Sequence, residues 1–159
     1  MAVELITKNS GAMSSANFMA LFKSALTDGK LDGCSITASG ANITVAAGRI
    51  IAGGALVVVE STTVTASAAG ELVLKIDTSD EGTALILARA ATTLTKQDLT
   101  GSGTVYEIQL ATFGFSGGAV SGLTVKLGAA KPVASASSPK IYVQQAQPSA
   151  PQTGDLWLW

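Results

Sequence analysis

The stretch that decides the fold is "ANITVAAGRIIAGGALVVVES", residues 41–61. Short runs rich in β-branched residues alternate here with small residues, which predicts strands over Ile43–Ala46, Arg49–Ala52 and Ala55–Glu60. The pair Gly53-Gly54 supplies the positive φ angles that a two-residue hairpin turn requires. The stretch therefore predicts antiparallel strands that are joined by tight turns.

Runs of the same kind follow along the chain and are separated by glycine, serine and aspartate. They are "STTVTAS" (61–67), "ELVLKID" (71–77), "TALILARA" (83–90), "TVYEIQLATFGF" (104–115) and "VSGLTVKLG" (120–128). In "ELVLKID", leucine and isoleucine alternate with Val73 and Lys75, as in a strand with one buried face. Short strands with turn signals between them predict a mainly β fold, a small antiparallel β-sandwich or barrel.

The one convincing helical pattern is "SSANFMALFKSALTDG", residues 14–29. Ser14 or Ser15 can cap its first turn, and Gly29 can end it in the left-handed conformation. An apolar stripe recurs at helical spacing and is expected to pack on a sheet; it consists of Phe18, Leu21, Phe22, Ala25 and Leu26.

Changes in composition divide the chain into three parts. An N-terminal segment with the helix covers residues 1–34, a β-sandwich body covers 35–128, and a linker with an extended C-terminal arm covers 129–159. Alanine, serine and proline dominate the linker, and "IYVQQ" can form one short strand. The segment "AQPSAPQTGD" is expected to be extended, because a residue before proline is disfavoured in the helical region.

Composition also limits the partners. Charged residues are 13% of the 159 residues, about half the usual share, which favours burial against other copies or other proteins. The net charge is −1 and the basic residues are scattered, so nucleic acid is not an expected partner. No apolar run reaches the roughly 18 residues of a membrane span, and the start lacks the features of a signal peptide. We therefore expect that the protein is made in a cytoplasm and that it does not associate with a membrane.

Reactive side chains are rare. The chain has no histidine and one cysteine, Cys34. This excludes Ser-His-Asp and Cys-His catalysis, histidine-containing zinc sites and disulfides within the chain. No cation flanks Cys34 in "DGCSI", so we expect a small buried side chain with an unreactive thiol.

The acidic residues form no catalytic or metal-binding pattern. Asp77, Ser79 and Glu81 resemble the start of a calcium loop, but no bidentate glutamate follows, and a polar hairpin turn is expected instead. Asp98 is expected to start a turn. The other acids considered lie singly, which disfavours a glycoside hydrolase: Glu60, Glu71 and Glu107. We expect no enzyme, no cofactor and no metal.

The stretch "NFMALFKSALTDGKLDGCSITASGANITVAAGRIIAGGALVVVES", residues 17–61, resembles the opening module of baseplate and tail-fibre proteins of bacteriophages. The matching residues are Gly33-Cys34, Gly48-Arg49, Gly53 and Gly54. The start, "MAVELITKNSG", resembles the first residues of the same proteins, although Lys8 stands where that pattern has glycine.

The end, "KIYVQQAQPSAPQTGDLWLW", resembles a segment of tail-fibre and other tail-tip proteins. The matching residues are Ile141–Gln144, Pro148, Thr153-Gly154-Asp155 and Trp157. The resemblance implies a non-enzymatic virion structural protein of a phage tail, made in the cytoplasm of the host bacterium. It also implies a homotrimer that binds other tail or baseplate subunits. Receptor-binding members extend into a tip domain, so a baseplate or tail-fibre adaptor with at most indirect host attachment is expected here.

The arm is the candidate interface, through Ile141, Tyr142, Val143, Leu156, Trp157, Leu158 and Trp159. Leucine and tryptophan alternate at its end, so a strand there can add to the edge of a sheet. A neighbouring chain is preferred as its docking surface, and the chain's own body is the alternative. Two other functions stay open: a capsid decoration or head-fibre protein, and a carbohydrate-binding adhesin module that would use aromatic residues such as Tyr106, Phe113 and Phe115.

Overall fold

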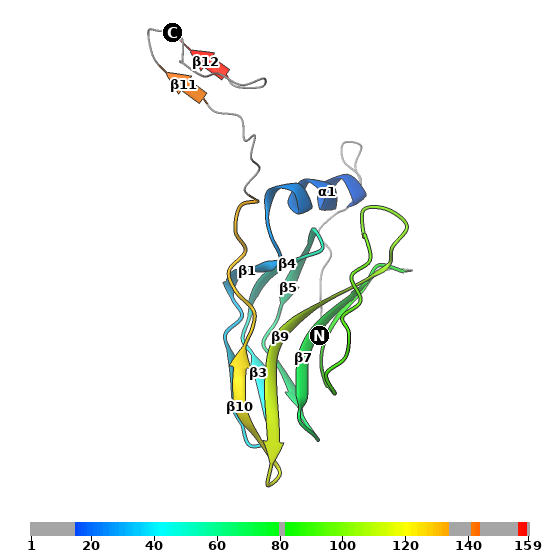
Figure 1. Cartoon of the computed structure of the whole chain (residues 1–159), viewed down its shortest axis with the longest axis vertical. Coiled ribbons are helices and arrows are strands. Elements are labelled where there is room, and N and C mark those ends of the chain that lie inside the picture. Colours follow the sequence, from blue (N-terminus) through cyan, green and yellow to red (C-terminus); the bar gives the residue numbers. More distant parts are fainter. Residues whose placement is uncertain (1–14, 80–81, 134–140, 144–155, 159) are drawn as a thin grey trace.

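The computed structural model describes residues 15–79, 82–133, 141–143 and 156–158, the last two as backbone (Figure 1). Within these ranges the fold is mainly β with one helix, α1 (Ser15–Ala25). The strands of the body are β1 (Gly29–Gly33), β2 (Ile36–Ser39), β3 (Asn42–Val45), β4 (Gly48–Ala52), β5 (Ala55–Val59), β6 (Thr62–Thr65), β7 (Gly70–Asp77), β8 (Thr83–Arg89), β9 (Val105–Ser116) and β10 (Ala119–Val125). The predicted small β-sandwich is confirmed, and the sheets do not close into a barrel.

The first layer of the sandwich is a bent meander. Two three-stranded antiparallel sheets form it, in the orders β1-β4-β5 and β2-β3-β6. Backbone hydrogen bonds join the two sheets across the bend: the Cys34 N–H donates to the Ala47 carbonyl at 3.1 Å, and the Ala46 N–H donates to the Ser35 carbonyl at 2.9 Å. Pairing therefore continues across the interruption that separates β1 from β2 and β3 from β4.

Two residues with positive φ angles mark the bend, and a β-bulge precedes it in β1. Gly33 and Cys34 have φ angles of 55° and 53°, and the register of β1 against β4 shifts between Lys30 and Asp32. The inward-facing residues are Ile43 and Val45 in β3, but Ile50 and Ala52 in β4. Because the side chains of a straight strand alternate with a period of two, this change from odd to even positions shows that the alternation is interrupted at the bend.

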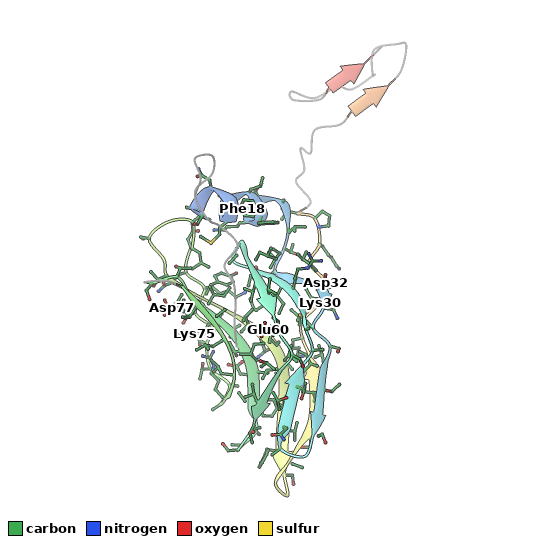
Figure 2. The ribbon with its side chains drawn as sticks, turned by 180° about the vertical axis from the view of Figure 1, so that it is seen from behind. Phe18, Lys30, Asp32, Glu60, Lys75 and Asp77 are labelled. Atoms are coloured by element: carbon green, nitrogen blue, oxygen red, sulfur yellow. The ribbon has the colours of Figure 1, made fainter. Side chains whose placement is uncertain are left out.

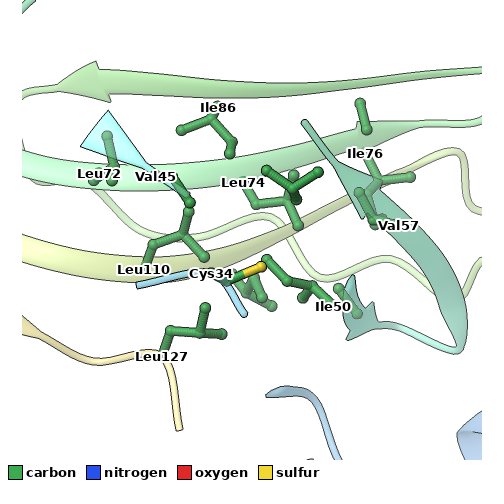
Figure 3. Close-up of a cluster of buried hydrophobic side chains, with 14 of the residues drawn as sticks. Cys34, Val45, Ile50, Val57, Leu72, Leu74, Ile76, Ile86, Leu110 and Leu127 are labelled. Atoms are coloured by element: carbon green, nitrogen blue, oxygen red, sulfur yellow. The ribbon is translucent and has the colours of Figure 1, made fainter. Parts of the chain in front are cut away.

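The second layer is the four-stranded antiparallel sheet β10-β9-β7-β8. It lies over the first layer, and the Val120 N–H donates to the Gly40 carbonyl at 2.8 Å where β10 meets β2. The core between the layers is aliphatic, as Figure 3 shows, and it is built from the inward faces of both sheets. Its labelled members include Val45, Ile50, Val57, Leu72, Leu74, Ile76, Ile86 and Leu110.

Helix α1 lies across one end of the sandwich (Figures 1 and 2). Its fully buried residue is Met19. The rings of Phe18 and Phe22 are half-buried and meet edge to face at 4.9 Å. The predicted apolar stripe is wrong at Leu21, which is 53% exposed, and at Ala25. The helix sits on the end of the sandwich, so a narrower face than the predicted stripe is buried.

Gly29 does not end the helix, which is a correction to the predicted cap. The helix stops at Ala25, and Gly29 is the first residue of β1 with φ of 156°, far from the left-handed helical region. A Cβ at Gly29 would lie 2.5 Å from the Ala130 nitrogen. Glycine is therefore needed there because another segment of backbone passes close by.

The β body extends past its expected limits of 35 and 128 at both ends. Strand β1 precedes residue 35, and residues 128–130 lie along it. The Lys30 N–H donates to the Gly128 carbonyl at 2.9 Å, and the Ala130 N–H donates to the Lys30 carbonyl at 2.8 Å. The expected linker therefore begins as an added strand-like segment on the edge of β1.

Cys34 is buried as predicted, with 1% of its surface exposed. Burial raises the pKa of its thiol, and the nearby Asp32 carboxylate raises it further. We expect a disulfide reagent to label Cys34 slowly in the native protein and rapidly in denaturant, since thiolate is the reactive form. Equal rates in the two states, followed by the absorbance of the released thiol, would contradict this.

Candidate functional site

The arm residues of the candidate interface form a small sheet of their own. Strand β11 (Ile141–Val143) pairs in parallel with β12 (Leu156–Leu158), and Tyr142 is opposite Trp157. Residues 144–155 connect the two strands, a length that suits the crossover of a parallel pair. Both strands were expected, but their pairing with each other was not. Trp159 lies outside the described residues.

A charged cluster is buried on the face of the four-stranded sheet that points away from the core. Leu72 and Leu74 of β7 point into the core, so Glu71 points the other way, and it is 1% exposed. Arg89 on β8 donates from Nε to Glu71 at 3.1 Å. Its Nη1 and Nη2 donate to the two oxygens of Glu107 on β9 at 2.9 and 3.0 Å. One guanidinium thus ties three strands together.

The connection between β8 and β9 covers this cluster with its backbone. The Thr92 N–H donates to Glu71 Oε1 at 3.2 Å, and the Thr95 N–H donates to Glu107 Oε2 at 2.9 Å. Gln109 Nε2 donates to the second oxygen of Glu71 at 2.6 Å. Both carboxylates therefore have enough donors to stay ionised while buried.

The pKa values follow from these contacts. Burial raises the pKa of Glu71, but the hydrogen bonds from Gln109, Thr92 and Arg89 outweigh it and hold that pKa below its ordinary value. Hydrogen bonds from Arg89 likewise lower the pKa of Glu107, and Lys75, its neighbour in register on β7 (Figure 2), contributes to this. The cluster is fully paired, so it holds strands together and lacks the free acid or base of a hydrolase.

A cavity opens along one edge of β9, between two places where other segments form backbone hydrogen bonds with that edge. The Glu107 N–H donates to the Thr95 carbonyl at 2.7 Å, and the Leu110 carbonyl accepts hydrogen bonds from the N–H groups of Lys126 and Leu127 at 2.8 and 3.0 Å. Between these two points lies a cavity of about 250 Å³ that β9 lines with Ile108 and Gln109. It is the clearest candidate binding site among the described residues.

One side of this cavity is built around Asp28. The Gly53 N–H donates to Asp28 Oδ1 at 2.8 Å, and the Tyr106 hydroxyl donates to Oδ2 at 2.7 Å. The Lys96 ammonium is 3.9 Å from the same oxygen and 5.6 Å from the centre of the Tyr106 ring. Burial and the Asp28 carboxylate raise the pKa of Tyr106, which keeps it a neutral donor.

The predicted turns have the expected local chemistry. Ser79 donates from N–H and Oγ to Asp77 Oδ1 at 3.0 and 2.6 Å. Asp98 accepts the Thr100 N–H at 3.0 Å, and the hydrogen bond from Lys23 of α1 lowers its pKa to about 2. Over the ranges that the structure covers, no group of three or more His, Cys, Asp and Glu residues could hold a metal ion.

Sequence reasoning missed both the charged cluster and the cavity. Glu71 and Glu107 were read as isolated acids, and Lys96 and Lys126 as scattered basic residues. Each of these groups comes together only through strand register, and a lone Arg89 in a strand was the one signal pointing to buried carboxylates nearby.

Comparisons with known proteins add no identity to these features. No model of a known protein family matches the chain, and no curated protein is similar to it. Among the described residues, no helix is long and apolar enough to cross a membrane.

Proposed function

We propose that the chain is a non-enzymatic structural subunit of a bacteriophage tail, a baseplate or tail-fibre adaptor that assembles as a trimer. In this proposal the β body forms the rigid part of the subunit. The arm, residues 141–159, is a latch that joins it to another subunit. Contact with the host surface is at most indirect.

The observation that supports the proposal is where the residues that match the phage pattern lie in the fold. Gly33 and Cys34 are the positive-φ residues of the bend, and a Cβ at Gly48, which is opposite Gly33, would lie 2.4 Å from the Asp32 carbonyl oxygen. Gly53 and Gly54, with φ of 58° and 86°, form the β4–β5 turn, and Gly54 packs against the backbone of α1 at Met19. The resemblance therefore falls on residues that shape the backbone, which is what a shared structural module requires.

Apolar and low-charge surfaces also favour assembly. Leu31, Leu85, Val125 and Val133 are each at least 40% exposed on the body. A two-stranded sheet as short as β11–β12 is marginal alone and gains stability from a further surface. The marginal two-stranded sheet is typical of an element that a neighbouring chain completes.

The test is to separate purified particles into heads and tails and to follow this chain by peptide mass spectrometry. We expect the full chain in the tail fraction, and a chain without residues 152–159 to fold normally but to be depleted from tails. Recovery with heads would favour a capsid protein instead. Wild-type incorporation of the shortened chain would contradict the latch.

A further inference from the structure

The cavity on the edge of β9 has an apolar floor and a basic rim. Its lining includes two buried core residues, Ile108 and Leu127, and the half-buried Leu94, and we call these three the floor. Lys96 and Lys126 stand at the rim, both exposed. A site of this kind suits a ligand that combines an apolar side chain with a carboxylate.

The charges at the rim do not balance. Asp28 is the carboxylate at the rim, and it already accepts hydrogen bonds from Gly53 and Tyr106 while it lies beside Lys96. Lys126 makes no ion pair with any residue in the described part of the chain. The rim therefore has a surplus positive charge that faces an apolar floor.

We propose that this cavity is the docking site for residues 155–158 of a second copy of the chain. Asp155 is the only charged residue of the arm, and it directly precedes Leu156 and Trp157. Its carboxylate would lie between Lys96 and Lys126, with an apolar neighbour on the floor. The inference rests on the proposed role of the arm as a latch and names the surface that receives it.

The backbone fits the same occupant. Strand β12 is already extended, and the edge of β9 between Glu107 and Leu110 is the gap between two hydrogen-bonded partners. An extended segment entering there would continue the edge of the sheet, as in other cases of strand addition. A second copy is preferred as the source, as it is for the latch in the proposed function, and the isotope experiment below separates it from the chain's own arm.

Zero-length crosslinking of carboxylates to amines tests the contact directly. Full-length chains labelled with ¹⁴N and ¹⁵N are refolded together, crosslinked and digested. We expect peptides that join Asp155 to Lys126 or Lys96, with both isotopes in one crosslinked product. If none of these products carries both isotopes, the arm lies on its own body, and if none of these crosslinks forms, the arm lies elsewhere; either result overturns the proposal.

Charge variants measure the energetic part of the contact. Lys126→Glu and Asp155→Lys should each weaken self-association about tenfold in sedimentation velocity, and the double variant should restore it. Lys131→Glu is the matched control, since Lys131 is also an exposed lysine but lies outside the cavity. Equal effects of Lys126→Glu and Lys131→Glu, or no rescue in the double variant, would overturn the inference. Recovery of the chain in tails without these crosslinks would leave the proposed function standing and remove only this docking site.

Discussion

Replacing Gly48 with alanine is expected to lower the free energy of unfolding by about 3 kcal/mol or more. The added Cβ would lie 2.4 Å from the Asp32 carbonyl oxygen, 2.6 Å from the Cys34 nitrogen and 2.7 Å from the Cys34 sulfur. Two of these three atoms are backbone, so no side-chain rotation relieves the overlap. Urea titration followed by circular dichroism measures the loss.

The matched control for this change is Gly101→Ala. The nearest heavy atom to a Cβ there is the Asp98 carbonyl oxygen at 3.8 Å, an ordinary contact distance. Neither Gly48 nor Gly101 has a positive φ angle, so the two variants differ in space and not in backbone strain. If Gly48→Ala is as stable as Gly101→Ala, the close contact of Gly48 with Asp32 and Cys34 is wrong.

Replacing Arg89 with methionine is expected to cost about 3 kcal/mol at neutral pH, because it leaves two buried carboxylates without their cation. Glu71 and Glu107 are 1% and 4% exposed. Changing both to glutamine in the Arg89→Met background removes the stranded charges and should recover part of the loss. Arg49→Met, which breaks an exposed pair with Asp32, should leave stability nearly unchanged.

The pH dependence gives this prediction a second readout. In the wild type the folded pKa values of Glu71 and Glu107 lie below the ordinary glutamate value, so their contribution to stability is present above that ordinary value and is lost as the pH falls through the folded pKa values. In Arg89→Met the same carboxyls are buried without a cation, so their folded pKa values rise and stability falls as the pH rises. The difference in the free energy of unfolding between the wild type and Arg89→Met should therefore increase from acid to neutral pH. A difference that does not change with pH would contradict the buried cluster.

The strands from β3 to β10 and the turn at Gly53-Gly54 could be predicted because their signals are local, whereas β1 was not predicted. Leu72, Leu74 and Ile76 alternate along β7 whatever the strand packs on, and the pair Gly53-Gly54 forms a turn by its own φ angles. The helix could be located for the same reason. Its buried face could not, because that face depends on how much of α1 the end of the sandwich covers.

The sequence by itself determined the class of the fold and the hairpin at Gly53-Gly54, since both signals lie in neighbouring residues, and it predicted the burial of Cys34 from the apolar character of that side chain. Tertiary structure alone decided the bend at Gly33-Cys34, the ion pairs of Arg89 with Glu71 and Glu107, and the cavity at the edge of β9. The physical reason is strand register. A bulge that shifts one strand by a single residue changes which distant side chains meet, and such a shift cannot be predicted from composition.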